Sequence, residues 1–303
     1  MLDATAAGVF TIAATPFRPD GSLDLDSIDT MVDFYAERGA TGLTILGIMG
    51  EAGELSGNES EAVIARVIAR TDLPVVVGVS APQMEAVIRT SETAMAHGAA
   101  GVMVAPQGTL VGDDAITAYF QAVSQRLGDI PWVLQDFPLV TKIHIPTPVL
   151  RAIFDTCGNC VMLKHEDWPG LEKITDLRQA EAEGARRVSI LCGNGGQFLL
   201  EEMLRGVDGA MTGFAYPEMM RDVVSLCNSG EIDRARDLFD AYLPLVRYEC
   251  QPGLGLAARK YILAKRGAIA HPTARKAGAT LTPAAMAEID TLIARQEARL
   301  SAL

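Results

Sequence analysis

A lysine closes an apolar run that is typical of a short buried strand. The run is Val161-Met162-Leu163, and Lys164 follows it directly. Burial at such a position disfavours the charged ammonium form, and a neutral amine can attack a ketone to form an imine. The pattern therefore predicts Lys164 as a nucleophile toward a carbonyl substrate. The alternatives are a lysine that extends to solvent at the rim, or one that only pairs with Glu166.

A glycine-flanked turn follows another apolar strand and consists of Gly47, Ile48, Met49, Gly50 and Glu51. Exposed backbone N–H groups in such a turn can hold a carboxylate, so all five residues are candidates for substrate binding. We expect the N–H groups around Met49 and Gly50 to make the contact. Glu51 is expected either to contact the substrate or to orient the turn by hydrogen bonding. An ordinary loop between a strand and a helix is the alternative.

A polar pair, Gln135 and Asp136, leaves a third apolar strand just before Phe137 and Pro138. Successive side chains of a strand point to opposite sides, so only one of the pair is expected to face the centre of the fold. Asp136 is a candidate for substrate binding and Gln135 for the reacting centre. The alternative for Asp136 is that it merely caps the loop.

Asn194 lies between Gly193 and Gly195 after a fourth apolar strand. Glycines at these positions let a ligand approach the backbone closely. We expect Asn194 and Gly195 to contact the substrate. The alternatives are a phosphate site at a helix N-terminus and a plain tight turn.

These four segments are positioned by short apolar strands that alternate with amphipathic helices. The expected strands are Val9–Ala14, Gly42–Leu46, Val75–Val79, Gly101–Val104, Trp132–Gln135, Val161–Lys164, Val188–Cys192 and Gly209–Thr212. The expected helices between them include Leu25–Arg38, Glu59–Arg70, Met84–His97 and Leu171–Glu183. Such alternation implies parallel strands joined by crossover helices, hence an α/β fold.

Eight strand–helix units over roughly residues 8–225 favour a (β/α)₈ TIM barrel, whose active site lies at the carboxyl ends of the strands. A doubly wound open sheet is the alternative, and the absence of a G-x-G-x-x-G turn after the first strand weakens its dinucleotide-binding version. From residue 217 onward the patterns are helical. We expect a barrel domain over residues 1–225 and a C-terminal helical extension over 226–303, packed on the barrel.

Composition narrows the range of partners. The 26 basic and 38 acidic residues give a formal net charge of −12, which argues against nucleic acid or an anionic membrane. No apolar run is long enough to cross a bilayer, and the N-terminal residues lack the pattern of a signal peptide. We therefore expect a soluble cytoplasmic protein. Cys157 and Cys160 have C-x-x-C spacing, but no matching pair of further ligands lies nearby, so we expect no metal.

Taken together and in order, these segments resemble the dihydrodipicolinate synthase / N-acetylneuraminate lyase superfamily over nearly the whole chain. Thr15-Pro16-Phe17 is similar to its T-P-F element, residues 47–51 stand at its G-T-T-G-E turn, and Lys164 stands at its Schiff-base lysine. Gly193-Asn194-Gly195 stands at its stretch after strand seven. The resemblance implies a lyase that forms a Schiff base with a 2-oxo acid, without metal or organic cofactor, in a homo-oligomer (a dimer or tetramer).

The departures from the family pattern bear on the substrate. Gln135 replaces the family's tyrosine, and Ile48 and Met49 replace the two threonines of G-T-T-G-E. The arginine that dihydrodipicolinate synthases use for the second substrate's carboxylate falls at Val140. Its absence argues against authentic dihydrodipicolinate synthesis.

One branch of the superfamily, the 2-keto-3-deoxyarabonate dehydratases, has a comparable pattern. It shares Q-D-x-P at residues 135–138 and G-A-M-T-G-x-x-x-P at 209–217, and its W-L-P-L is similar to Tyr-Leu-Pro-Leu at 242–245. This similarity favours dehydration of a 2-keto-3-deoxy sugar acid. Gln135 cannot titrate, which leaves water, Glu166 or Asp136 as the proton carrier. Alternatives are a pyruvate-dependent aldolase or dihydrodipicolinate synthase-like enzyme, and a non-catalytic 2-oxo-acid-binding homologue.

Overall fold

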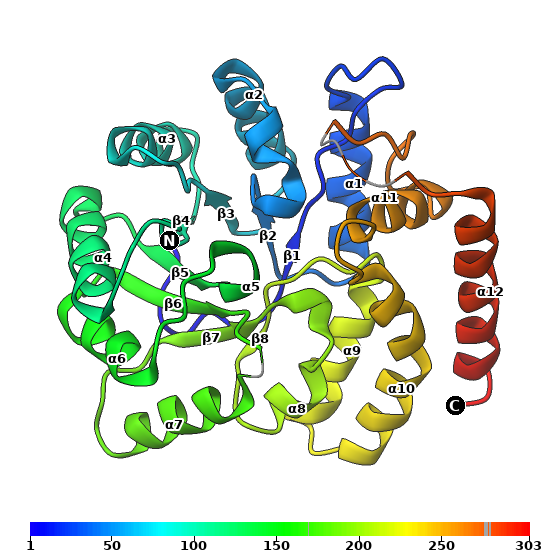
Figure 1. The fold of residues 1–303 in the computed structure, drawn as a ribbon. Coiled ribbons are helices and arrows are strands. Elements are labelled where there is room, and N and C mark those ends of the chain that lie inside the picture. Colours follow the sequence, from blue (N-terminus) through cyan, green and yellow to red (C-terminus); the bar gives the residue numbers. More distant parts are fainter. Residues whose placement is uncertain (169, 276–277, 279) are drawn as a thin grey trace.

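A closed barrel of eight parallel strands forms the centre of the molecule (Figure 1). The computed structural model describes residues 1–168, 170–275, 278 and 280–303. Each strand pairs with the next along the chain, and the last strand pairs with the first. The strands are β1 (Gly8–Ile12), β2 (Gly42–Ile45), β3 (Val75–Gly78), β4 (Gly101–Val104), β5 (Trp132–Asp136), β6 (Cys160–His165), β7 (Ser189–Cys192) and β8 (Gly209–Ala210). The expected TIM barrel is confirmed, and the open doubly wound sheet is wrong.

Helices follow every strand and surround the barrel (Figure 1). Those of the outer layer are α1 (Leu25–Glu37), α2 (Gly57–Arg70), α3 (Met84–Ala96), α4 (Asp113–Leu127), α5 (Pro138–Thr141), α6 (Thr147–Thr156), α7 (Leu171–Ala182), α8 (Leu199–Met203) and α9 (Pro217–Asn228). Short 3₁₀ turns lie at η1 (Ile48–Gly50), η2 (Ala52–Glu54) and η3 (Asn194–Gly196). Two of these turns, η1 and η3, belong to segments that the sequence marks as candidates for substrate binding.

Helix α2 begins earlier than the apolar pattern predicts. Ser56 caps it: the Ser56 hydroxyl accepts from the Glu59 N–H at 3.3 Å, while the Glu59 carboxylate accepts from the Ser56 N–H at 2.9 Å. This reciprocal pair satisfies two backbone donors that the helix itself leaves without partners. The helix therefore starts at Gly57 instead of at the expected Glu59.

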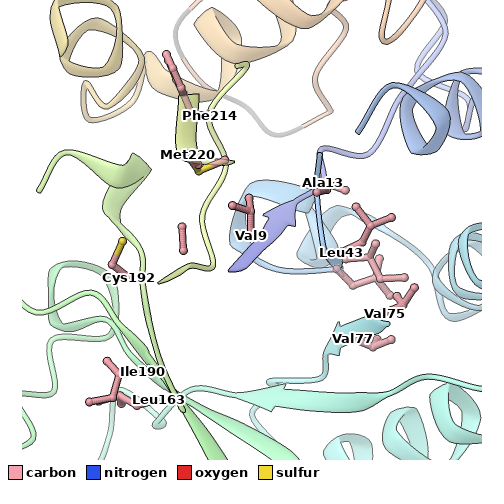
Figure 2. Packing of buried hydrophobic residues seen from close by; sticks show 14 of the residues in the cluster. Val9, Ala13, Leu43, Val75, Val77, Leu163, Ile190, Cys192, Phe214 and Met220 are labelled. Carbon is pink, nitrogen blue, oxygen red and sulfur yellow. The ribbon is translucent and has the colours of Figure 1, made fainter. Parts of the chain in front are cut away.

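Side chains of each strand alternate between the barrel interior and the helical layer. The interior cluster contains Phe10, Ile12, Val76, Met103, Val133, Met162, Leu191 and Met211. The larger outer cluster includes Val77, Leu163 and Ile190, which Figure 2 shows among the residues packed around the barrel. Since Val133 and Met162 point inward, Gln135 and Lys164 do so too, two residues further along each strand.

The C-terminal extension consists of α10 (Ile232–Glu249), α11 (Gly255–Lys265) and α12 (Pro283–Leu300). Helix α10 packs against α9 and α8, and α11 and α12 pack against α10 (Figure 1). The boundary expected at residue 225 falls within α9, which runs to Asn228, so the division into domains stays a prediction. Within the described residues, no helix combines the length and the apolar character needed to span a bilayer.

Gly209 closes the seam between the last strand and the first. It pairs with Gly8 and has φ of +146°, and an added Cβ would lie 2.8 Å from the backbone C and N atoms of Gly8. A side chain here both strains the backbone and pushes β1 away from β8. We expect Gly209→Ala to lower the free energy of unfolding by about 3 kcal/mol, measured by urea denaturation.

Gly158→Ala is the matched control, because an added Cβ there meets nothing within 4 Å. Its free energy of unfolding is expected to stay within about 0.5 kcal/mol of the unmodified protein. Equal stability of the two variants would contradict the steric role assigned to Gly209.

Candidate active site

Lys164 and Gln135 are register partners on the adjacent strands β6 and β5, close to their carboxyl ends. Both side chains are buried, and Lys164 is only 5% exposed. The Lys164 Nζ atom lies 3.1 Å from Oε2 of Glu166, and the Gln135 Nε2 atom donates to that same oxygen at 2.7 Å. The barrel mouth therefore holds one amine, one carboxylate and one amide in direct contact.

Glu166 follows β6 directly, and its position explains why it meets the lysine. It stands two positions after Lys164, so the strand's alternation carries both side chains to the inner face. Asn194 holds it from the neighbouring loop: the Asn194 Nδ2 donates to the Glu166 carbonyl at 2.8 Å, and the Asn194 N–H lies 3.5 Å from Glu166 Oε1. Asn194 thus holds the Glu166 backbone through its side chain and faces the carboxylate with its backbone N–H. Its expected contact with the substrate stays a prediction.

The loop that presents Asn194 is itself fixed to β8. Asn194 has a left-handed φ of +49°. The N–H of the next residue, Gly195, donates to the Thr212 hydroxyl at 2.8 Å. Since its N–H group is already used, Gly195 holds the loop, and any contact that it makes with a substrate involves other atoms.

The turn over residues 47–51 differs from expectation in its choice of donors. The Gly50 N–H bonds the Gly47 carbonyl at 2.9 Å, and the Glu51 N–H bonds the Ile48 carbonyl at 3.3 Å. Gly50 was expected to offer its N–H to a substrate, but the 3₁₀ turn already uses it. Among the described residues, the N–H groups of Ile48 and Met49 form no hydrogen bond, so these are the donors that the turn can present.

The side chains of this turn lie in different surroundings. Met49 packs against the interior cluster of the barrel, whereas Ile48 is partly exposed to solvent. Glu51 is buried, and its carboxylate pairs with Lys260 of α11 and accepts from the Arg275 N–H at 2.8 Å. Of the two roles expected for Glu51, this geometry favours orientation of the turn.

Asp136 lies on the other side of β5 from Gln135, between the barrel and the helices. Its carboxylate accepts from Lys173 of α7 at 2.8 Å, and Lys173 also pairs with Asp167 at 2.6 Å. Asp136 is fully buried, and this burial raises the pKa of its carboxyl although Lys173 opposes the shift. The strand therefore directs Gln135, and not Asp136, toward the reacting lysine.

Three residues near the site were not singled out from the sequence. Lys173 bonds Asp136, the Glu202 carboxylate of α8 pairs with His165 Nδ1 at 3.0 Å, and Lys260 pairs with Glu51. A charged residue on the apolar face of a helix was the available signal, since Lys260 stands among the buried residues of α11. Their partners lie far away in sequence, so the pairings themselves left no local pattern.

Gly193 leaves room for the Glu166 side chain. An added Cβ at Gly193 would lie 2.6 Å from Cδ and 2.7 Å from Oε1 of Glu166. We expect Gly193→Ala to displace the carboxylate from Lys164 and to lower kcat about 100-fold, because an error of about 1 Å in the position of a reacting group has this effect. Steady-state kinetics on an accepted 2-oxo acid checks the prediction.

Gly53→Ala serves as its control, because an added Cβ there meets nothing within 4 Å. Both variants are expected to fold. A Gly193→Ala enzyme with unchanged kcat would show that the position of Glu166 does not matter.

Comparison with known proteins places this geometry in a family. A model of the dihydrodipicolinate synthetase family matches residues 5–296. A crystal structure of a dihydrodipicolinate synthase from Rhodopseudomonas palustris is 52% identical, has a TM-score of 0.95, and the match covers 97% of this chain and 99% of that one.

Two curated relatives bear different functional names. A 4-hydroxy-tetrahydrodipicolinate synthase from Methanothrix thermoacetophila is 28% identical over 79% of this chain and 80% of its own length. An L-2-keto-3-deoxyarabonate dehydratase from Azospirillum brasilense is 26% identical over 93% of this chain and 92% of its own length. The family model, both relatives and the closed barrel with its buried lysine all indicate the same family. The chain belongs to the dihydrodipicolinate synthetase family of Schiff-base lyases.

Proposed function

We propose that the protein dehydrates a 2-keto-3-deoxy sugar acid through an imine on Lys164, with Glu166 as the proton carrier. The observation that carries the proposal is the Glu166 carboxylate oxygen shared by Lys164 and Gln135. An amide that cannot titrate holds the carboxylate in place, so the proton chemistry falls to Glu166 alone. Asp136 and Gly50, which were also considered for the site, face away from Lys164 or use their donor within the turn.

The first step joins the substrate to the enzyme. The neutral amine of Lys164 attacks the C2 ketone, and the resulting carbinolamine loses water to give an iminium. Glu166 accepts the proton that the ammonium loses, because the two groups lie 3.1 Å apart. It then gives this proton to the carbinolamine hydroxyl, which leaves as water, so that Glu166 is again a carboxylate when the iminium has formed. The substrate carboxylate rests on the N–H groups of Ile48 and Met49, as a turn with two donors directed at one point allows.

The second step removes water. The iminium withdraws electrons from C3, so Glu166 removes a C3 proton and an enamine forms. The protonated Glu166 then gives that proton to the C4 hydroxyl, which leaves as water while the enamine electrons form the C3–C4 double bond. Hydrolysis of the imine regenerates Lys164 and releases a product that tautomerises to a dioxo acid with all carbon atoms retained. The Glu166 carboxylate thus serves both proton transfers, and it is again a carboxylate at the end of the step.

The comparisons support this chemistry at the level of the class. The Azospirillum relative named as an L-2-keto-3-deoxyarabonate dehydratase matches 93% of this chain, so a dehydratase is built on the same frame.

Pyruvate-dependent aldol chemistry is the second candidate, and the relatives' names favour it. The Rhodopseudomonas structure at 52% identity is named as a dihydrodipicolinate synthase, and the Methanothrix relative as a 4-hydroxy-tetrahydrodipicolinate synthase. Against a dihydrodipicolinate synthase stand Gln135 in place of a tyrosine and Val140, an exposed apolar residue of α5, in place of the arginine. A non-catalytic 2-oxo-acid-binding protein is disfavoured, since binding alone needs no amine paired with a carboxylate.

Product analysis separates these candidates. The protein is incubated with 2-keto-3-deoxypentonic and 2-keto-3-deoxyhexonic acids, and separately with pyruvate plus aspartate semialdehyde. A dioxo acid with unchanged carbon count supports the dehydratase, whereas release of pyruvate, or its consumption with the semialdehyde, overturns it in favour of aldol chemistry. The homo-oligomer stays a prediction, for which sedimentation of the purified protein gives the subunit number.

A further inference from the structure

Lys260 in α11 carries a fully buried positive charge (0% exposed) outside the reacting cluster. Its Nζ atom donates to the carbonyls of Thr15 and Thr273, both at 2.8 Å, and pairs with the Glu51 carboxylate. The same atom lies 4.5 Å from the centre of the Phe17 ring, a distance typical of a cation–π contact. The ammonium thus uses all three of its N–H donors on protein atoms.

The other ends of these contacts lie in the turn that offers the two N–H donors. Glu51 closes that turn with a left-handed φ of +54°, which is unfavourable for a residue with a side chain. Its neighbour Gly50 is held as well, because the Thr15 hydroxyl donates to the Gly50 carbonyl at 2.5 Å. Contacts from the extension and from the loop after β1 therefore meet at the C-terminal end of the turn.

Arg275, a second residue of the extension, also contacts this turn. The Arg275 N–H donates to Glu51 at 2.8 Å, and its guanidinium bonds the carbonyls of Gly21 at 2.6 Å and Glu54 at 3.2 Å. The guanidinium also lies 4.4 Å from the Phe17 ring centre. Arg275, which follows α11, thus fixes the turn together with Lys260.

We propose that Lys260 is a positioning residue for substrate binding: through Glu51 it holds the Ile48 and Met49 N–H groups in the geometry that receives the substrate carboxylate. This inference rests on the proposed function, in which that turn binds the carboxylate. Two buried charges lose their hydration, and an apolar pair of similar volume would often stabilise a fold as well. The pair fixes one strained backbone conformation beside a site that needs two N–H groups directed at one point. This positioning role explains why the chain retains a pair that costs desolvation free energy.

The prediction concerns binding more than chemistry. Without Lys260, Glu51 can relax from its left-handed conformation. The N–H groups of Ile48 and Met49 then no longer point at the same position. Gln135 belongs to β5, Lys164 to β6, and Glu166 directly follows β6. We expect these three residues to stay in place. We expect Lys260→Met to raise the KM for pyruvate at least tenfold and to leave kcat within threefold, both measured as exchange of the pyruvate methyl protons with D₂O.

Two further variants separate positioning from loss of folding. Lys260→Met takes one cation away from the buried Glu51 carboxylate, whereas the double variant Glu51→Gln/Lys260→Met removes both charges of the pair. Arg259→Met is the matched control, because Arg259 is the adjacent buried cation of α11 but pairs with Glu249 of α10. The double variant is expected to recover the melting temperature lost by Lys260→Met while its KM stays raised, and Arg259→Met is expected to keep its KM within twofold.

Each other outcome overturns the inference. It fails if folded Lys260→Met or the double variant has a KM within twofold of the unmodified enzyme. It also fails if KM recovers together with the melting temperature, or if Arg259→Met raises KM as much as Lys260→Met. Borohydride treatment of the unmodified protein with pyruvate tests the proposed function separately. A stable adduct on Lys164 with unchanged KM in the variants rejects only the role of Lys260, and no adduct rejects the Schiff-base function itself.

Discussion

Lys164→Ala is expected to lower turnover by a factor on the order of 10⁴ or more, because it removes the nucleophile that forms the covalent intermediate. In the unmodified protein, borohydride should trap pyruvate as a stable secondary amine on Lys164, since that side chain is the amine beside Glu166 at the barrel mouth. The variant should show no such adduct. Peptide mass spectrometry locates the added mass, and product formation from the accepted 2-oxo acid gives the turnover.

Lys173→Met is the matched control for this variant. Lys173 is a nearby, mostly buried lysine, but it pairs with Asp136 and Asp167 on the helical side of the strands. Its loss is expected to lower stability and to leave the adduct on Lys164. If Lys164→Ala retained turnover or the adduct, the imine mechanism would be wrong.

Glu166→Gln is expected to lower kcat about 100- to 10,000-fold, the usual contribution of a general acid–base group. The amide keeps the shape of the side chain and can still bond Lys164 and Gln135, but it cannot take up the C3 proton. Imine formation should slow but still occur, because solvent can take the ammonium proton that Glu166 takes in the first step, whereas enamine formation should fail. Exchange of pyruvate methyl protons with D₂O, followed by NMR, reports the second step, and borohydride trapping reports the first.

Glu202→Gln tests whether any buried carboxylate in this region has the same effect. Glu202 is buried and pairs with His165, which points away from the barrel axis. That variant is expected to exchange pyruvate protons at nearly the unmodified rate. Normal exchange by Glu166→Gln would instead assign the proton transfer to water or to another group.

The barrel itself could be predicted from the sequence because its signals are local. Apolar runs of strand length alternate with amphipathic helices, and all eight strands were expected within a few residues of their positions. Two strands end two residues earlier than expected: β1 ends at Ile12, and β8 ends at Ala210 although its pattern continues to Thr212. There the Thr212 hydroxyl accepts from Gly195, a contact between loops that no periodicity contains.

The reacting cluster was also within reach of sequence reasoning. Lys164 and Glu166 are two residues apart, so the alternation of a strand brings them to one face. Gln135 and Asp136 were recognised as a pair of which one faces inward. The choice between them depended on register, which the structure gives as Gln135 opposite Lys164.

The support of the carboxylate turn could not be predicted. Glu51 and Lys260 are separated by 209 positions, and neither residue alone indicates a buried pair. The hydrogen bond of the Gly50 N–H to Gly47 is a property of the 3₁₀ turn, and the sequence pattern of two glycines is compatible with many turns. Such features depend on tertiary contacts and on backbone conformation, not on local preference.

The alternation of inner and outer residues on β5 and β6 has a consequence for how such enzymes diversify. Under the proposed function, the inner residue Gln135 limits which proton transfers are possible. Its neighbour Asp136 faces the helical layer and bonds Lys173 of α7. Exchange of the inner residue can therefore change the reaction with little disturbance of the fold. Overall sequence identity therefore reflects common ancestry, whereas the few inward side chains at the strand ends bear on which reaction is possible.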